Sequence, residues 1–212
     1  NEITKRFLST IILIPTVLFF IIKGSFLFNF FIFICFLIST YEWLKLSKNN
    51  LLKIFGTIFL VISFYTIFKI RNEFDRDYYH LLLVVIICVS TDIGGYTFGN
   101  IFKGPKLTKI SPKKTYSGVI GSFLLSLIFT NLFLDFLSNV ETFEFTKEMF
   151  LFILLVSLVS QIGDIIISYF KRKSKIKDTG TIIPGHGGIL DRIDGMIFAL
   201  PFSYVFFLNF NF

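Results

Sequence analysis

Residues 149–170 read MFLFILLVSLVSQIGDIIISYF and contain one charged side chain, Asp164. An apolar block of about 18 or more residues is long enough to cross the hydrocarbon core of a bilayer as an α-helix. Similar blocks recur along the 212-residue chain, in which 54% of residues are hydrophobic, 31 are Phe and only 17% are charged. This is more apolar surface than one water-soluble core of that length could bury. The sequence therefore predicts an integral membrane protein.

Seven such blocks predict an all-α, polytopic protein with one helical membrane domain over residues 1–212. The first two blocks are short and are separated only by Lys23-Gly24-Ser25, so a count of six or eight helices is left open. The predicted spans are 7–22, 26–40, 51–70, 81–99, 118–138, 149–170 and 196–210.

The positive charge is distributed unequally between the two sides that these spans define. The chain has 21 Lys and Arg residues and a formal net charge of +7. Most of them fall in the N-terminal segment and in the 41–50, 100–117 and 171–195 loops, which therefore should face the cytoplasm, with Phe212 outside. Lysines in short loops between apolar blocks favour orientation and anionic ligands over nucleic acid as their explanation. The richness in Phe, Ile, Lys and Asn fits an AT-rich genome and a bacterial cytoplasmic (inner) membrane.

The longest polar stretch, residues 168–194, joins the last two predicted spans and contains far more than a simple tether needs. It combines Lys and Arg residues, three carboxylates, His186 and a Pro-Gly-x-Gly-Gly turn in which the backbone can approach a ligand closely. These residue types together indicate a phosphate and metal site. The alternative is a solvated loop whose lysines only set the orientation, which for Lys173 and Lys175 is equally acceptable.

Two further carboxylates, Asp164 and Asp92, lie within predicted spans, where an ionisable side chain is unfavourable unless it meets a cavity, a partner or a metal. Both are therefore candidate functional residues, although a helix–helix hydrogen bond is the alternative for Asp164. Gly95 and Gly99, after Asp92, are better explained by close helix packing than by binding. The 100–117 loop adds Ser111-Pro112-Lys113-Lys114-Thr115, which offers hydroxyl and ammonium groups to phosphate oxygens.

The 168–194 stretch resembles the signature of phosphatidate cytidylyltransferases, in which Ser-x-apolar-Lys-Arg is followed by Lys-Asp, Pro-x-His-Gly-Gly and Asp-Arg-x-Asp. The Asp-x-x-Gly-Gly-Tyr pattern from Asp92 and the Ser-Pro-Lys-Lys-Thr segment also resemble that family. The matching positions of the signature are Ser168, Lys171, Arg172, Lys177, Asp178, Gly180, Pro184, His186, Gly187, Gly188, Asp191, Arg192 and Asp194.

The resemblance implies transfer of a cytidylyl group from CTP to phosphatidic acid, at a site built mainly from residues 90–117 and 161–195. It implies that Asp164 and Asp191 ligate Mg²⁺ and leaves room for a second cation near Asp194 or Asp178. Pairing between two copies of the chain is left open. The implied catalytic residues are Asp164, Asp191, Asp194, Lys171, Arg172 and Arg192, and the implied substrate-binding residues are Ser168, Lys177, Asp178, His186, Gly187, Gly188, Asp92, Ser111, Lys113, Lys114 and Thr115.

Two alternatives remain at this point. A CDP-alcohol phosphotransferase is also a small helical membrane enzyme, but its Asp-Gly-x-x-Ala-Arg pattern is absent, although Asp194-Gly195 begins in the same way. An ion-coupled transporter would place Asp92 and Asp164 on its pathway. Against it, the polar residues gather in loops with phosphate-type chemistry, and no matching pair of broken helices is evident.

Overall fold

The computed structural model of the protein describes residues 2–72, 78–108, 111, 114–137 and 145–209, with side chains from Leu8 onward. Within these residues the chain forms helices and no strand, as the apolar blocks predict. The helices are α1 (Glu2–Lys23), α2 (Ser25–Leu46), α3 (Asn50–Asn72), α4 (Tyr79–Phe102), α5 (Tyr116–Leu137), α6 (Lys147–Lys173), α7 (Leu190–Ile193) and α8 (Met196–Asn209).

Five of these helices, α2 to α6, are long and apolar enough to cross a membrane, which makes the protein an integral membrane protein. Residues Leu8–Lys23 and α8 form shorter apolar helices. The polytopic, all-α prediction is therefore confirmed, whereas the count of seven spans stays a prediction.

Several helix ends differ from the predicted ones. The largest difference is in α2, which continues to Leu46 rather than ending at residue 40. The reason is packing: Glu42, Trp43 and Leu46 are all buried, and the Trp43 indole donates to the carbonyl of Leu52 at 3.2 Å. Part of the predicted 41–50 loop is thus the last turn of a helix.

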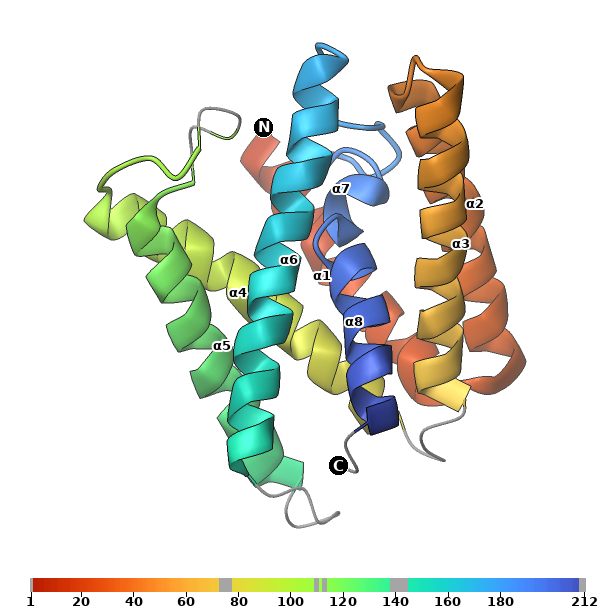
Figure 1. The fold of residues 1–212 in the computed structure, drawn as a ribbon. Coiled ribbons are helices and arrows are strands. Elements are labelled where there is room, and N and C mark those ends of the chain that lie inside the picture. The colour runs from red at the N-terminus through yellow and green to blue at the C-terminus, as the bar shows by residue number, and fades with distance from the viewer. Residues whose placement is uncertain (1, 73–77, 109–110, 112–113, 138–144, 210–212) are drawn as a thin grey trace.

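The connections alternate between the two ends of the bundle. The N-terminus, the α2–α3 turn and the 103–115 and 174–189 connections lie at one end, and the C-terminus lies at the other (Figure 1). This is the grouping that the charge distribution predicts, although which end faces the cytoplasm stays a prediction. At the α1–α2 turn, Gly24 has a φ of +61°, which glycine adopts without steric penalty, and Arg71 Nε donates to the carbonyl of Ile21 at 2.8 Å.

Helix α6 is central, because it contacts α4 and α5 on one side and α8 on the other. Its Phe152, Ile153 and Val156 side chains are fully buried in the core. Helices α4 and α5 pack closely because glycines face each other: a Cβ on Gly118 would lie 2.8 Å from the carbonyl oxygen of Gly95. The expectation that Gly95 serves close helix packing is confirmed.

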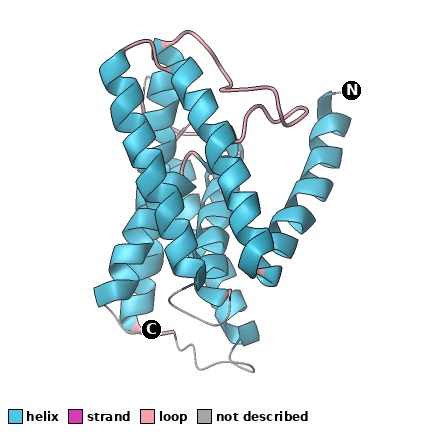
Figure 2. Ribbon diagram, turned by 90° about the vertical axis from the view of Figure 1, so that its right-hand side faces the viewer, coloured by secondary structure: helices cyan, strands magenta, loops and turns pink. Residues whose placement is uncertain are grey.

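Helix α1 lies at the edge of the bundle and leans away from the other helices toward its N-terminal end (Figure 2). The 174–189 connection reaches across to it, where Ser9 Oγ lies 2.6 Å from His186 Nδ1.

Candidate active site

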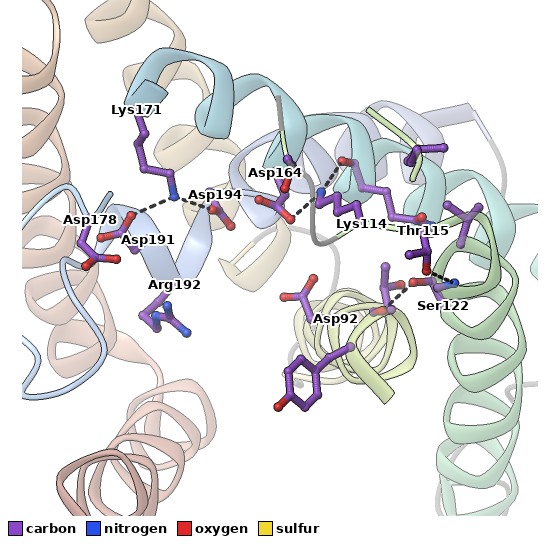
Figure 3. Close-up of a pocket in the computed structure, with 18 residues that line it drawn as sticks. Asp92, Lys114, Thr115, Ser122, Asp164, Lys171, Asp178, Asp191, Arg192 and Asp194 are labelled. Carbon is purple, nitrogen blue, oxygen red and sulfur yellow. Dashed lines mark hydrogen bonds and ion pairs between the residues drawn. The ribbon is translucent and has the colours of Figure 1, made fainter. Parts of the chain in front are cut away.

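A polar pocket of about 390 Å³ lies beside the two long connections (Figure 3). It is bordered by α4, α5, α6 and α7, so that segments far apart in the sequence meet there. Among its lining residues are the acidic Asp92, Asp164, Asp178, Asp191 and Asp194, the basic Lys114, Lys171 and Arg192, and the hydroxyl-bearing Ser111 and Thr115. All ten belong to the residues that the sequence predicts for the site.

Helix α6 supplies one wall of the pocket because Asp164, Ser168 and Lys171 follow each other at helical spacing along one face. Ser168 Oγ donates to Asp164 Oδ1 at 3.2 Å. The other carboxylate oxygen, Asp164 Oδ2, is paired with Lys114 Nζ at 2.5 Å, and this ammonium also donates to the carbonyl of Gln161 at 3.3 Å. The Lys114 ammonium of the 103–115 connection thus contacts α6 at two points.

Lys171 joins α6 to the end of the 174–195 segment. Its ammonium lies 2.9 Å from Asp191 Oδ1 and 3.4 Å from Asp194 Oδ2. Burial alone would raise the pKa of Asp191, but hydrogen bonding from Gly188 and Lys171 outweighs it and holds that pKa below its usual value. Burial, and then the negative charge of Asp164, raise the pKa of Asp194 to about 8. The two acids that contact Lys171 therefore differ in acidity, and Asp191 is the one that ionises more readily.

Asp191 also organises the backbone of the 174–189 connection. Its Oδ2 accepts hydrogen bonds from the backbone N–H of Thr179 at 2.7 Å and from that of Gly188 at 2.9 Å. The Thr179 hydroxyl lies 3.0 Å from the same oxygen. A carboxylate that accepts several such bonds fixes the chain that donates them, so Asp191 shapes the loop as well as facing the pocket.

Glu42, near the end of α2, supports the same connection from its opposite side. Its side chain is 1% exposed, and it accepts hydrogen bonds from the backbone N–H groups of Ile189 at 3.1 Å and Leu190 at 2.8 Å. Glu42 Oε2 also lies 3.0 Å from the Thr179 hydroxyl. One threonine proton is thus shared between Glu42 and Asp191. Glu42 is not among the residues predicted from the sequence, although its position as an acid at the end of an apolar block is a signal that could have indicated it.

On α4, Asp92 and Tyr96 line the pocket opposite α6. The α5 side is fixed by Ser122, whose hydroxyl donates to the carbonyl of Thr91 at 2.8 Å, and by Thr115, whose Oγ1 accepts from the N–H of Gly118 at 3.1 Å. The close α4–α5 packing therefore brings Asp92 and Thr115 to the same pocket.

A profile of the Cytidylyltransferase family matches residues 50–210 of the chain. The chain belongs to the cytidylyltransferase family. It is similar to a protein named phosphatidate cytidylyltransferase from Rickettsia conorii, with 35% identity over 93% of this chain and 87% of that protein. Proteins of the same name from Haemophilus influenzae and Bacillus subtilis are 37% and 35% identical. Those matches cover 76% and 70% of this chain and 59% and 55% of the relatives.

Some residues that the family signature singles out do not line the pocket. Ser168 donates a hydrogen bond to Asp164, and Arg172 donates one to the carbonyl of Ile176 at 3.3 Å. His186 contacts Ser9 and Thr10 of α1, the latter at 3.4 Å. Lys177, Gly187 and Gly188 belong to the 174–189 connection and are likewise absent from the lining. Lys113 lies outside the described residues.

The chemistry of the pocket fits a divalent cation of the kind that the family resemblance implies. Its lining holds five carboxylates against three cationic side chains, and both predicted metal ligands, Asp164 and Asp191, already face an ammonium group. Within the described residues no three or more His, Cys, Asp or Glu side chains form a group that could hold a metal ion. Magnesium does not require such a group, because it keeps several waters and uses one or two carboxylates together with substrate phosphates.

Proposed function

We infer that the protein transfers the cytidylyl group of CTP to phosphatidic acid, forming CDP-diacylglycerol and releasing pyrophosphate. The observation that carries this is the meeting of the motif residues from α4, the 103–115 connection and the 174–195 segment in one polar pocket. Relatives that bear the name of this enzyme support it along most of the chain. The family match favours it over a CDP-alcohol phosphotransferase or an ion-coupled transporter.

The reaction joins two anions. A phosphate oxygen of phosphatidic acid attacks the α-phosphorus of CTP, the bond between that phosphorus and the bridging oxygen breaks, and pyrophosphate leaves with that oxygen. A phosphate monoester is largely ionised at neutral pH, so the attacking group needs little help from a general base. The protein must instead offset charge and align the reactants. The pocket is lined by three positively charged side chains that can do this, those of Lys114, Lys171 and Arg192.

Asp164 and Asp191 are the proposed ligands of Mg²⁺, with Asp194 or Asp178 near a second cation or orienting Arg192. When bound, the metal would supply positive charge to the α- and β-phosphates. Lys171 would then be available to the leaving pyrophosphate. Arg172, Lys177 and His186 lie outside the pocket lining, so their predicted substrate contacts depend on phosphates that extend beyond it.

In this proposal the end of the bundle that carries the two long connections faces the cytoplasm of a bacterium. Water-soluble CTP would enter from that side while the acyl chains of phosphatidic acid stay in the inner membrane. The positive-inside rule supports this orientation. Pairing of two copies remains a prediction that the site does not require.

The test is to purify the protein in detergent and incubate it with phosphatidic acid, Mg²⁺ and CTP labelled at the α-phosphate. We expect label in the organic phase, none after chelation, and recovery when Mg²⁺ is returned. Asp164→Asn and Asp191→Asn should lower the rate by at least about 1000-fold, since each removes a charge from the reacting centre. Asp135→Asn, which alters an exposed acid on α5 outside the pocket, is the matched control. Folded protein that labels no lipid with any divalent metal would exclude the activity.

A further inference from the structure

A second cavity, almost entirely apolar, lies between α1 and the rest of the bundle. Its volume is about 560 Å³, larger than that of the polar pocket. Helices α1, α2, α3, α4 and α8 all contribute to its wall, and so do Ile182, Ile183, Pro184 and Ile189 of the 174–189 connection. Apart from Ser9, Thr16, Cys35 and Arg192, its lining residues carry purely hydrocarbon or other apolar side chains.

Arg192 connects the two cavities. Within the described part of the chain it is the one residue that lines both the polar pocket and the apolar cavity. Figure 3 shows its side chain extending from α7 on the side away from Lys171. Two of the neighbouring acids, Asp191 and Asp194, pair with Lys171, and the charge of Arg192 also acts on Asp92. No hydrogen bond or ion pair joins the Arg192 guanidinium to another described residue, and the side chain is exposed.

The juxtaposition defines the chemistry of a ligand. An unpaired guanidinium favours a phosphate, which it can bind through two parallel hydrogen bonds. A large apolar cavity in a membrane protein favours hydrocarbon, because unfilled space forfeits the dispersion contacts of its lining. A molecule that satisfies both must carry a phosphate within a few atoms of a long hydrocarbon chain.

We propose that the apolar cavity between α1, α4 and α8 holds one acyl chain of phosphatidic acid, with Arg192 on the phosphate of that lipid. This rests on the proposed function for the identity of the lipid. The two substrates would then be divided between two spaces, with the nucleotide in the polar pocket and the lipid chain in the apolar cavity. The phosphate of the lipid is thereby held where the two spaces meet, close to the nucleotide it must attack.

The arrangement also gives α1 a role. Leu8 and Ile12 line the cavity while remaining 54% and 67% exposed, so the α1 side of the cavity borders the surface of the molecule. A lipid could pass there from the bilayer without leaving an apolar environment. The contact between Ser9 and His186 ties the same helix to the connection that shapes the polar pocket.

The first test narrows the cavity from two opposite walls with Val85→Phe on α4 and Val17→Phe on α1. Val89→Phe is the matched control, because Val89 lies one turn from Val85 on the same helix, is 41% exposed and does not line the cavity. We expect Val85→Phe and Val17→Phe to raise the apparent KM for dipalmitoyl phosphatidic acid about tenfold, the usual effect of a filled apolar subsite. The KM for CTP and the turnover of dihexanoyl phosphatidic acid should change less than about twofold, which also shows that the variants are folded.

Equal KM values for dipalmitoyl phosphatidic acid in Val85→Phe, Val17→Phe and Val89→Phe would overturn the proposal.

A second test needs no variant. Wild-type protein is placed in vesicles with phosphatidic acid that carries a photoreactive diazirine on one acyl chain, and the crosslinked peptides are mapped. Labelling of α1, α4 and α8 should far exceed that from a phosphatidylcholine with the same diazirine. Equal labelling by both lipids would mean that the cavity is a gap filled by any bilayer lipid. Absence of cytidylyl transfer by the wild-type protein would instead contradict the proposed function and leave a selective crosslink standing.

Discussion

The two connections that border the polar pocket are built in different ways. In the described part of the 103–115 connection, the N–H of Leu107 donates to the carbonyl of Lys114 at 2.8 Å. Its Lys114 ammonium pairs with Asp164, and Ser111 and Thr115 of the same connection also line the pocket. The 174–189 connection is instead held by two carboxylates, Glu42 and Asp191, which together accept hydrogen bonds from four backbone N–H groups.

Because of this difference, substitutions in the two connections should affect different properties of the site, its charge in one case and its geometry in the other. In the 103–115 connection, a substitution of Lys114 changes the charge at the site and breaks the contacts of its ammonium group with Asp164 and with the carbonyl of Gln161. In the 174–189 connection the carboxylates determine where the backbone lies, so that a substitution changes the geometry of the site even when it lies outside the pocket. The same loss of activity can therefore have two physical causes, which variants can distinguish.

The largest effect expected from this comparison is that of Lys114→Met. The substitution keeps the length of the side chain but removes a cation aimed at the pocket, and loss of one such group lowers kcat by about 100-fold or more. Exchange of backbone amide hydrogens in the 103–115 connection should stay as in the wild type. Lys106→Met is the control, because Lys106 lies in the same connection, is exposed and does not line the pocket. A Lys114→Met protein with near-normal kcat would show that the ion pair with Asp164 only fixes the loop.

A smaller effect, with a different cause, is expected for Glu42→Ala. It leaves the N–H groups of Ile189 and Leu190 without their acceptor, and each unsatisfied buried donor costs about 1–3 kcal/mol. We expect kcat to fall roughly tenfold, which is about 1.4 kcal/mol of activation free energy, because the connection that also binds Asp191 is no longer held in place. Exchange of amide hydrogens across 174–190 should become faster. Glu42→Gln, which keeps one acceptor oxygen, should recover part of both.

Ser39→Ala is the control for that experiment. Ser39 is fully buried one turn before Glu42 on α2, and within the described residues its hydroxyl has no hydrogen-bond partner. Its removal should leave kcat and amide exchange unchanged. If Ser39→Ala lowered kcat as much as Glu42→Ala, the effect would belong to packing of α2 and not to support of the connection.

Much of this architecture could be predicted from the sequence because the bilayer restricts the outcome. An apolar block of sufficient length must form a helix in lipid, where each backbone polar group needs an internal partner. The same restriction makes Asp92 and Asp164 conspicuous, because a carboxylate in such a block needs a reason to be there. Both line the pocket, as do Asp191, Arg192 and Asp194 of the signature.

What could not be predicted depends on contacts between distant segments. Glu42 lies far from the signature in sequence, and only the folded chain shows that its carboxylate meets the 174–189 connection. The continuation of α2 to Leu46 has the same origin, since tertiary burial of Trp43 and Leu46 extends the helix past the predicted boundary. The direction of a side chain in a glycine-rich turn is similarly undetermined by spacing, and His186 is an example.

His186 gives the smallest expected effect and sharpens the comparison most directly. The signature implies that it contacts substrate, whereas its ring lies against Ser9 and Thr10 of α1. If its role is to hold α1 against the connection, His186→Ala and Ser9→Ala should each lower kcat/KM by only a few fold, as expected for loss of one hydrogen bond. The double variant should be no worse than His186→Ala, because both substitutions remove the same contact. A loss of 100-fold or more in His186→Ala alone, with Ser9→Ala near normal, would return His186 to the substrate and imply that the turn moves when CTP binds.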